Sequence, residues 1–531
     1  MTTFASHTVS PARNLAVDLT ATMPASPSTI PPAPDPNTGF DVAGKHVYMI
    51  GIGGSGMSGL AHVLAARGAH ITGSDSAATT TTESLQRAGM AIGFDQSAGK
   101  LPEHCDLIIA SAAIKPSHPQ MVNAAIRNLP TLNYAEALGR CMLGRTTVCI
   151  AGTHGKSTTT SMLGCIAADA GLDPTTIVGA SCHQLHGAQA TNSGSFRVGS
   201  PVIPLGTMAG SPGLFIAESC EFNRSFHNYH PTMAVITSVE ADHLDVYGSL
   251  EAVVESFHHF ASLVAPADQG GLLLIAHDHA HRQQVTAGIK AKVQTIGFES
   301  AADWVVSFDP ETREARLTDP AKRVALTWNN NIPGAHNAMN AATAAVIALS
   351  LGAAANSIAN SLSAFRGVDR RAQYLGHRNH ASGGVVRIYD DYGHHPTEVA
   401  ATLKALRQFE APERRNGRLI CVFQPHQHSR TRHLLGEFAD AFAAADIVIV
   451  PDIYFVRDSE EERHLVTAAH LVDRLRTKGV RAMHLYPFAA IIEQLESLAK
   501  PGDLLVVMGA GPVNEVAYGY LKQNDTPAAS K

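Results

Sequence analysis

The sequence predicts an α/β protein built from three domains, and three observations support this fold class. Apolar, β-branched runs of strand length alternate with amphipathic helical segments along most of the chain. Glycine-rich turns follow two of these strands and lead directly into helices, as in nucleotide-binding α/β domains. The length of 531 residues exceeds what one core accommodates. The expected domains are residues 43–142, 143–367 and 368–531.

Composition and charge narrow the class of protein. The net charge of −6 does not indicate the excess of basic residues that is typical of proteins that bind nucleic acid or an anionic membrane. No apolar run approaches the ~20 residues of a membrane span. Seven scattered cysteines without C-x-x-C spacing favour reduced thiols over a disulfide framework. We therefore expect a cytoplasmic protein that binds neither nucleic acid nor membrane.

Residues 1–42 differ from the rest in being rich in Pro, Ala, Ser and Thr. They lack the continuous apolar stretch of a secretory signal and the Arg-rich amphipathic pattern of a transit peptide. Such a composition buries too little apolar surface to fold, so this tail is predicted to be disordered.

The first domain begins with a strand and a glycine-rich turn. Residues 46–50 form the strand, and G-I-G-G-S-G at 51–56 matches G-x-G-x-x-G before a helix. Asp75 follows the second strand at the distance where an acidic residue reaches a ribose. The pattern predicts a Rossmann-like domain for a nucleotide diphosphate and does not distinguish NAD, FAD or a UDP-sugar. The alternative is that the glycines only permit close helix–strand packing.

The central domain opens with the most informative stretch of the chain. Residues 147–151 read as a buried strand, and G-T-H-G-K-S-T at 152–158 leads into a helix. Such a turn presents backbone N–H groups to a phosphate, with Lys156 for the β- and γ-phosphates and Ser157 for Mg²⁺. The loop is a shortened P-loop, because Ile150 stands where the general pattern has glycine. An ordinary strand–turn–helix corner with an exposed lysine is the alternative.

Two further strands of this domain deliver metal-ligating side chains. Residues 214–217 end at Glu218, and residues 232–237 lead into D-H-L-D at 242–245. Acidic and imidazole groups beside a phosphate loop are placed to hold the Mg²⁺ of a nucleotide. We predict a metal site made of Ser157, Glu218 and His243, with a surface turn as the alternative for the D-H-x-D.

The remainder of the central domain offers weaker signals. Residues 183–212 are rich in glycine and serine and are expected to be a surface excursion. Residues 249–264 predict an amphipathic helix whose aromatic side chains belong to the core. Asn337 and Asn340 share a face at the start of an alanine-rich helix, where they cap the helix or bind an adenine edge.

The third domain alternates strand and helix, which predicts a doubly wound, Rossmann-like parallel sheet. Ligands of such sheets bind at the carboxyl ends of strands. Two ends carry D-D-Y-G-H-H-P at 390–396 and Q-P-H-Q-H-S-R-T-R at 424–432, which we expect on adjacent strands. His, Tyr and Arg in these clusters suit a small zwitterion, with arginine for its carboxylate. A solvated rim or a structural zinc site is the alternative.

In their order along the chain, these motifs resemble those of the Mur ligase family. The segments that carry the resemblance are G-I-G-G-S-G-M-S-G (51–59), A-G-T-H-G-K-S-T-T-T (151–160), A-E-S-C-E (217–221), D-H-L-D (242–245), H-N-A-M-N-A (336–341), G-V-D-R-R (367–371), D-D-Y-G-H-H-P-T-E (390–398) and Q-P-H-x-x-S-R-T-R (424–432). Two departures stand out. Gln427 occupies a position where the family usually has arginine, and Cys220-Glu221-Phe222 replaces a more acidic sequence.

The resemblance implies a role for each matching residue. Catalytic roles fall to Lys156, Glu218, His243, Arg371, Asp391 and His394. ATP binding falls to Gly152, Thr153, His154, Gly155, Lys156, Ser157, Thr158, Asn337, Asn340, Arg370 and Arg371. Binding of the sugar nucleotide or the amino acid falls to Gly51, Gly53, Gly54, Ser55, Gly56, Met57, Ser58, Asp75, Tyr392, His394, His426 and Arg430.

The family also implies an architecture and an activity. The architecture is an N-terminal UDP-binding Rossmann-like domain, a central P-loop-type ATPase domain and a C-terminal Rossmann-like domain. The activity is the ATP- and Mg²⁺-dependent joining of L-alanine to the lactyl carboxylate of UDP-N-acetylmuramate through an acyl phosphate. The alternatives are a ligase that adds a tripeptide to the same sugar nucleotide, an NAD-dependent oxidoreductase and a non-catalytic nucleotide-binding regulator. We expect a monomer or a weak homodimer.

Overall fold

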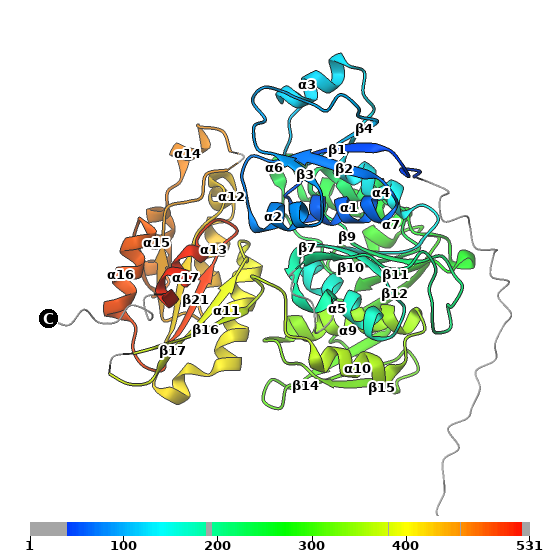
Figure 1. The fold of residues 1–531 in the computed structure, drawn as a ribbon. Helices are drawn as coiled ribbons and strands as arrows, with labels where there is room; N and C mark the ends of the chain where they lie inside the picture. The colour runs from blue at the N-terminus through cyan, green and yellow to red at the C-terminus, as the bar shows by residue number, and fades with distance from the viewer. Residues whose placement is uncertain (1–39, 187–193, 381, 457, 523–531) are drawn as a thin grey trace, which may run out of the picture.

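The computed structural model of the protein describes residues 40–186, 194–380, 382–456 and 458–522, which fold into three sheets flanked by helices (Figure 1). The sheets follow one another along the chain, because each is built from consecutive strands. The predicted α/β class and three-domain architecture are confirmed. Most of the tail predicted to be disordered, residues 1–42, lies outside the described residues.

The N-terminal sheet has five parallel strands in the order β3-β2-β1-β4-β5. The strands are β1 (His46–Ile50), β2 (His70–Ser74), β3 (Ala91–Gly93), β4 (Leu107–Ala110) and β5 (Thr131–Asn133), and the helices are α1 (Ser55–Ala66), α2 (Thr80–Arg87), α3 (Pro119–Ile126) and α4 (Tyr134–Met142). Because the strand order reverses at β1, a binding crevice is expected at its carboxyl end, where the glycine-rich turn leads into α1.

The central sheet has ten strands in the order β15-β14-β13-β12-β11-β10-β6-β9-β7-β8. The strands are β6 (Thr146–Ala151), β7 (Thr175–Cys182), β8 (Gly194–Arg197), β9 (Leu214–Glu218), β10 (Met233–Ile236), β11 (Leu272–Ala276), β12 (Lys292–Gly297), β13 (Trp304–Phe308), β14 (Glu314–Thr318) and β15 (Val324–Asn329). The helices are α5 (Lys156–Asp169), α6 (Leu244–Tyr247), α7 (Leu250–Ser262), α8 (Arg282–Thr286), α9 (Ala335–Ser350) and α10 (Ala355–Ala364), with short 3₁₀ turns η1 (His183–His186), η2 (Phe222–Asn228) and η3 (Ala267–Gln269). The parallel part of the sheet places the phosphate loop between β6 and α5.

Part of the region expected to be a surface excursion, residues 183–212, is instead structural. Gly194–Arg197 forms β8, an edge strand antiparallel to β7. Its Phe196 ring stacks on His62 of α1, with 4.2 Å between ring centroids. The sequence does not predict this strand, because the strand is short and its single large apolar residue gives no alternating pattern of apolar and polar positions. The segment therefore helps to join the central and N-terminal domains.

The C-terminal sheet has six strands in the order β16-β17-β21-β18-β19-β20, parallel except for β16. The strands are β16 (Gln373–Asn379), β17 (Val385–Asp391), β18 (Leu419–Phe423), β19 (Ile447–Val450), β20 (Arg481–His484) and β21 (Leu504–Met508). The helices are α11 (Pro396–Glu410), α12 (His428–His433), α13 (Leu435–Ala441), α14 (Glu462–Leu465), α15 (Ala468–Thr477), α16 (Phe488–Leu498) and α17 (Asn514–Lys522), with a 3₁₀ turn η4 (Pro412–Arg415). The expectation that the two polar clusters follow adjacent strands is wrong, because β21 is inserted between β17 and β18. The chain's last strand takes this place through a long-range pairing that local sequence does not reveal.

The domains meet through two chemically different interfaces. The N-terminal and central domains share one cluster of buried apolar side chains, to which Leu60 of α1 and Phe215 of β9 both belong. The C-terminal domain has apolar clusters of its own and contacts the central domain through polar pairs such as Arg430–Asp242. In Figure 1 it stands beside the other two domains, with α11 facing the central domain. Since polar interfaces between domains permit relative motion, we expect the C-terminal domain to open and close.

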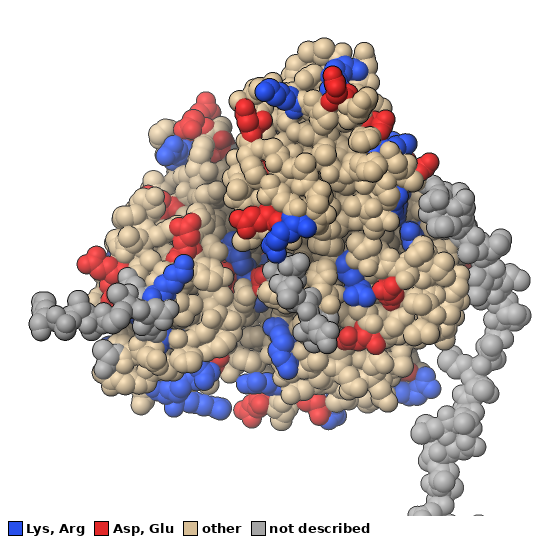
Figure 2. Space-filling model, viewed as in Figure 1, with Lys and Arg blue, Asp and Glu red and all other residues tan. Residues whose placement is uncertain are grey.

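The surface shows no large patch of one charge on the face drawn in Figure 2. On the face shown in Figure 2, acidic and basic side chains are interspersed. Among the described residues, no helix has the length and apolar character needed to cross a bilayer. Some of the polar residues that the sequence singles out, such as Ser157, Asn340 and Arg371, line a cavity between two domains.

Candidate active site

The phosphate loop joins β6 to α5 at the centre of the large sheet, beside the end of β9. Gly152 and Gly155 have φ angles of 129° and 81°, which side chains rarely adopt. A Cβ atom would lie 2.0 Å from Thr237 Oγ1 at Gly152 and 2.5 Å from Asn340 Oδ1 at Gly155. Both the backbone and the available space therefore require glycine at these two positions.

Lys156 is partly buried at the start of α5 and held by three neighbours. Its Nζ donates to the carbonyl oxygens of Gly152 (2.5 Å) and Thr153 (3.1 Å) and lies 2.9 Å from a carboxylate oxygen of Glu221. Burial works to lower the pKa of Lys156, but the charge of Glu221 raises it above its usual value. The lysine is a fixed cation at a helix N-terminus, where the helix dipole also favours an anion.

The predicted metal ligands Ser157, Glu218 and His243 come from three different segments. Ser157 Oγ donates to Glu218 Oε1 at 2.9 Å. Two oxygen donors in contact suit Mg²⁺, which prefers oxygen ligands. His243 is close enough to Lys156 for that charge to affect its pKa, which burial lowers. Its nitrogen is a less preferred ligand for Mg²⁺ than the two oxygens.

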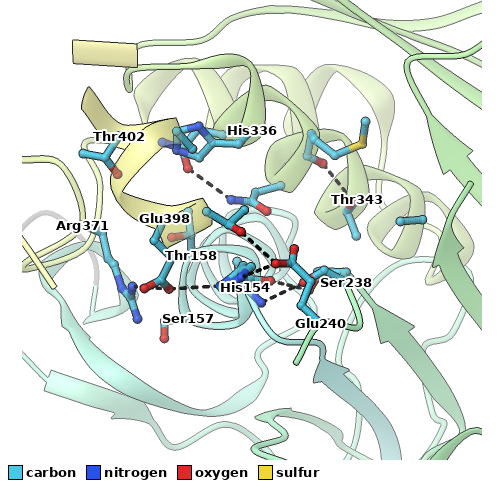
Figure 3. Close-up of a pocket in the computed structure, with 18 of the residues that line it drawn as sticks. His154, Ser157, Thr158, Ser238, Glu240, His336, Thr343, Arg371, Glu398 and Thr402 are labelled. Atoms are coloured by element: carbon cyan, nitrogen blue, oxygen red, sulfur yellow. Dashed lines mark hydrogen bonds and ion pairs between the residues drawn. The ribbon is translucent and has the colours of Figure 1, made fainter. Parts of the chain in front are cut away.

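A cavity of about 370 Å³, the nucleotide cavity, lies between the central and C-terminal domains beside the phosphate loop (Figure 3). The lining residues that the sequence analysis assigned to ATP binding or catalysis are His154, Gly155, Ser157, Thr158, Asn337, Asn340, Arg371 and Asp391. Apolar side chains such as Ile236 and Met339 line it as well. An apolar cavity with a few convergent polar groups is typical of small-molecule sites.

The amide pair of α9 does not cap the helix, whose N-cap residue is Gly334, and binding of an adenine edge stays a prediction. Asn337 Nδ2 donates to the carbonyl oxygen of Pro333 at 2.7 Å, which secures the start of the helix. Asn340 Nδ2 donates to Asn337 Oδ1 at 3.2 Å, and Asn340 also lies against Gly155 of the phosphate loop. Both asparagines line the nucleotide cavity, and these hydrogen bonds fix their amide groups there.

His336, which also lines the nucleotide cavity, should make stability depend on pH. Burial lowers the pKa of His336 from 6.5 to about 4, so the unfolded chain binds a proton here that the folded chain excludes. Stability therefore falls as the pH drops below 6.5, by about 2 kcal/mol at pH 5 for this group. We expect urea unfolding to show that the free energy of unfolding falls by about 2 kcal/mol less in His336→Gln than in wild type when the pH is lowered from 7.5 to 5. Parallel pH curves for the two proteins would contradict this.

Five charged or titratable side chains form an interdomain cluster: His154, Glu240, Arg371, His395 and Glu398. His154 Nδ1 lies 3.3 Å from Glu398 Oε1, and His154 Nε2 lies 3.4 Å from Glu240 Oε2. Arg371 lies 3.7 Å from Glu398 on its other side. Figure 3 shows Arg371, Glu398, His154 and Glu240 in a row across the interface. Burial works to lower the pKa of His154, but hydrogen bonds to both carboxylates raise it to about 9.

Glu398 and Glu240 are two members of this cluster to which no sequence motif assigned a role. Glu398 is partly buried at the start of α11 and accepts the backbone N–H groups of His394 (2.9 Å) and His395 (3.2 Å). Burial works to raise its pKa, but the surrounding cationic groups hold it well below its usual range. In the sequence, Pro396 and Glu398 indicate the start of a helix with a capping box. They do not indicate that Glu398 contacts the phosphate loop.

Tyr392, His394, His426 and Arg430 converge on one point and form the amino-acid cluster. The ring of His394 lies 5.5 Å from Tyr392 and 5.6 Å from His426, measured between centroids. Arg430 lies 3.3 Å from His426 Nδ1 and pairs with Asp242 of the central domain at 2.6 Å. The cluster therefore lies at the domain interface, in contact with Asp242, the residue before His243. The sequence alone could not show this contact.

His394 presents an unprotonated nitrogen. Its Nδ1 lies 3.0 Å from the carbonyl oxygen of Tyr392, which places the ring hydrogen on Nδ1 and leaves Nε2 as an acceptor. Burial lowers the pKa of His394 to about 4, so the ring is neutral at pH 7. A neutral, weakly basic imidazole is suited to orient a ligand N–H group more than to remove a proton from an ammonium.

Two predicted residues are engaged within the C-terminal domain. Arg370 donates to the carbonyl oxygens of Gly509 (2.6 Å) and Gly511 (3.1 Å), so Arg371 and not Arg370 lines the nucleotide cavity. Asp391 accepts the N–H groups of Ala372 and Gly393, each at 2.6 Å, and burial raises its pKa to about 6. Asp391 thereby fixes the chain directly after Arg371.

Gln427 and Tyr454 complete the surroundings of the amino-acid cluster. Gln427 is buried with φ of 67°, and its backbone N–H donates to the carbonyl oxygen of Tyr454 at 3.1 Å. The Tyr454 ring lies 5.7 Å from His426. Tyr454 lies in the segment after β19, outside every sequence motif, and was therefore not predicted.

A second cavity of about 250 Å³, the N-terminal cavity, lies between the first two domains. Ser55 and Ser58 from the glycine-rich turn line it together with residues that no motif marks: His62, Thr80, Thr81, Ser84, Leu85, Arg87, Ser181, Gly194, Ser195 and Phe196. Asp75 does not line it, and instead accepts the N–H of Gly53 at 2.7 Å. Met57 is buried in the core beneath the turn, while Gly51, Gly54 and Gly56 shape the backbone there.

Comparison with protein families assigns three consecutive parts of the chain. Residues 46–146 match the sequence model of the Mur ligase family, catalytic domain. Residues 150–348 match the Mur ligase middle domain, and residues 370–511 match the Mur ligase, glutamate ligase domain. Together the three matches cover most of the chain.

Individual relatives extend over nearly the whole chain. A UDP-N-acetylmuramate--L-alanine ligase of Agathobacter rectalis is 36% identical over 486 residues, which are 90% of this chain and 98% of the relative. One of Streptomyces coelicolor is 34% identical, covering 91% of this chain and 99% of the relative. Among solved structures, a UDP-N-acetylmuramate-alanine ligase of Thermotoga maritima has a TM-score of 0.71 at 22% identity, covering 90% of this chain and 99% of that one. A murein peptide ligase of Psychrobacter arcticus has a TM-score of 0.67 at 23% identity, with coverage of 92% and 100%. Both solved structures share the fold of this chain.

Proposed function

The chain belongs to the Mur ligase family, and from this premise we propose that it joins L-alanine to UDP-N-acetylmuramate at the expense of ATP. The observation that carries the proposal is the meeting of two sites: Arg430 of the amino-acid cluster pairs with Asp242, next to His243 and the phosphate loop. ATP at the phosphate loop and L-alanine at the amino-acid cluster could thus both reach the lactyl carboxylate of the sugar nucleotide. The oxidoreductase and regulator alternatives lose their support in a family of ligases.

The proposal gives each of the three substrates its own site. We assign the sugar nucleotide to the N-terminal cavity, where Arg87 supplies a cation and several hydroxyl groups supply hydrogen bonds. We assign ATP to the nucleotide cavity, with its phosphates between Arg371, which lines the cavity, and Lys156 of the adjoining phosphate loop. L-alanine belongs at the amino-acid cluster, with its carboxylate at Arg430. These nucleotides are metabolites of the cytoplasm, which is where we place the reaction.

The first step makes the carboxylate reactive. The lactyl carboxylate attacks the γ-phosphorus of ATP, and ADP leaves, so that an acyl phosphate forms. Lys156 and Arg371 stabilise the charge on the transferring phosphoryl group, chiefly by position and electrostatics. Ser157 and Glu218, with His243 nearby, would hold Mg²⁺, which supplies charge neutralisation at the phosphates when bound.

The second step forms the amide. The neutral amine of alanine attacks the acyl carbon, the C–N bond forms, and the C–O bond to phosphate breaks. Nε2 of His394 accepts a hydrogen bond from the amine and orients it, and the proton released from nitrogen passes to solvent or to the departing phosphate. Closure of the C-terminal domain is needed, because the amino-acid cluster and the phosphate loop lie in different domains.

Phosphate release with alternative amines tests the proposal. Purified protein is mixed with UDP-N-acetylmuramate, Mg²⁺-ATP and either L-alanine or the tripeptide L-alanyl-γ-D-glutamyl-meso-diaminopimelate. We expect release that depends on L-alanine and stays at background with tripeptide. Release with tripeptide alone would reassign the chain to the murein peptide ligases, and no release with either amine would remove the ligase function.

A further inference from the structure

Part of the interdomain cluster has the composition of a metal site. His154, Glu240 and His395 each offer one ligand atom, and these three atoms lie within 4.8 Å of one another. Two imidazoles and one carboxylate form a ligand set typical of zinc, whereas Mg²⁺ prefers oxygen. None of the three belongs to the Ser157–Glu218 pair. We propose that they bind a zinc-class divalent cation that ties the phosphate loop to the C-terminal domain.

The donor atoms are spaced for a tetrahedral ion. His154 Nε2 lies 3.4 Å from Glu240 Oε2, and His395 Nδ1 lies 4.0 Å from the same oxygen. Around zinc, with bonds of about 2.0 to 2.2 Å, neighbouring ligand atoms are about 3.3 Å apart. Shifts of about 1 Å or less would therefore complete the three-ligand shell, and one position would remain for water.

The surrounding contacts orient these ligands as in known metal sites. His154 Nε2 is buried and faces Glu240 Oε2 at 3.4 Å, while Nδ1 faces the carboxylate of Glu398 at 3.3 Å. A carboxylate behind a ligating histidine is the usual arrangement at zinc. Thr397 Oγ1 donates to Glu240 Oε2 at 2.8 Å and holds that carboxylate in place. The metal would replace a long hydrogen bond of 3.3 Å from the Thr397 N–H to His395 Nδ1.

The position of the site predicts its effect. His154 belongs to the phosphate loop and Glu240 follows β10, both in the central domain, whereas His395 precedes α11 of the C-terminal domain. A cation held by all three would keep the two domains closed. Turnover needs the domains to open for product release, so zinc should slow the reaction. This second effect rests on the proposed function, and binding itself does not.

Cobalt(II) provides a direct probe, because four-coordinate Co²⁺ absorbs visible light far more strongly than six-coordinate Co²⁺. We expect the full-length protein, without nucleotide, to bind one Co²⁺ with a four-coordinate spectrum that Zn²⁺ abolishes and millimolar Mg²⁺ leaves unchanged. His395→Asn removes the imidazole but keeps an oxygen that caps α11. It should weaken Co²⁺ binding at least about tenfold, as should Glu240→Gln. His183→Asn, at an exposed histidine paired with Asp369, is the matched control and should bind as wild type.

Each outcome decides the proposal. Absence of a four-coordinate spectrum overturns it, and so does wild-type affinity in either His395→Asn or Glu240→Gln. If one variant fails to fold by circular dichroism, the other decides. In the phosphate-release assay with excess Mg²⁺, half-inhibition by Zn²⁺ should need at least about ten times more metal in His395→Asn, each protein being compared with its own zinc-free rate. A chain without ligase activity would void this assay alone, because the Co²⁺ spectrum is independent of turnover.

Discussion

Lys156→Ala should lower alanine-dependent phosphate release by at least about 10³-fold, since it removes the cation at the phosphate loop that stabilises the transferring phosphoryl group. The same change leaves Glu221 buried without its partner, which we expect to destabilise the central domain by about 3–5 kcal/mol. Initial rates of phosphate release and urea unfolding measure the two effects separately.

A double variant distinguishes lost chemistry from lost stability. Lys156→Ala/Glu221→Gln removes the uncompensated charge, so it should unfold at a higher urea concentration than Lys156→Ala alone. Its phosphate release should stay as low as that of the single variant, because the phosphates still lack their cation. Turnover within about tenfold of wild type in either folded variant would contradict the role assigned to Lys156.

Glu398→Gln should lower phosphate release about 100-fold, although Glu398 lies outside every role assigned from the sequence. The carboxylate is a counter-charge to His154 and Arg371 and also accepts the backbone N–H of His394. An amide keeps an oxygen for the N–H group but loses the charge that positions the phosphate-binding side chains. The loss should appear in kcat, while KM for UDP-N-acetylmuramate stays unchanged because Glu398 does not line the N-terminal cavity.

Glu410→Gln is the matched control for this prediction. Glu410 also belongs to α11, is buried, and pairs with Arg387 and with the hydroxyl of Tyr389, at 2.6 Å from the latter. It lies 12 residues after Glu398 in the helix, about 18 Å away. We expect it to reduce stability without changing the rate per folded molecule. Equal rate losses in the two variants, or wild-type kcat in Glu398→Gln, would refute a positioning role for Glu398.

Much of the fold was predictable because local sequence encodes it. β6, β10 and β18 are runs of apolar and β-branched residues, and buried parallel strands need such runs. The short polar strand β8 was missed, since it is stabilised by pairing with β7 and by packing against α1, and neither leaves a periodic signal. Likewise, the insertion of β21 between β17 and β18 depends on pairings between residues far apart in sequence, such as Leu419 with Leu504 and Arg387 with Leu504.

The sequence by itself determined the elements whose chemistry is local. Two glycines and a lysine between a strand and a helix specify a phosphate loop, because the turn geometry and the helix N-terminus arise within a few residues. Glycines and serines before α1 similarly specify a nucleotide turn. The Mur ligase family assignment depends on such local motifs in their order along the chain.

Only the tertiary structure decided which side chains meet across the domain interface. Asp242 with Arg430, and His154 with Glu398, are 188 and 244 residues apart, yet each pair is in contact. Arg371 faces the nucleotide cavity and Arg370 does not, although they are neighbours in sequence. The physical reason is that electrostatic pairing acts through distance and burial, which are properties of the folded chain and leave no periodic pattern in the order of residues.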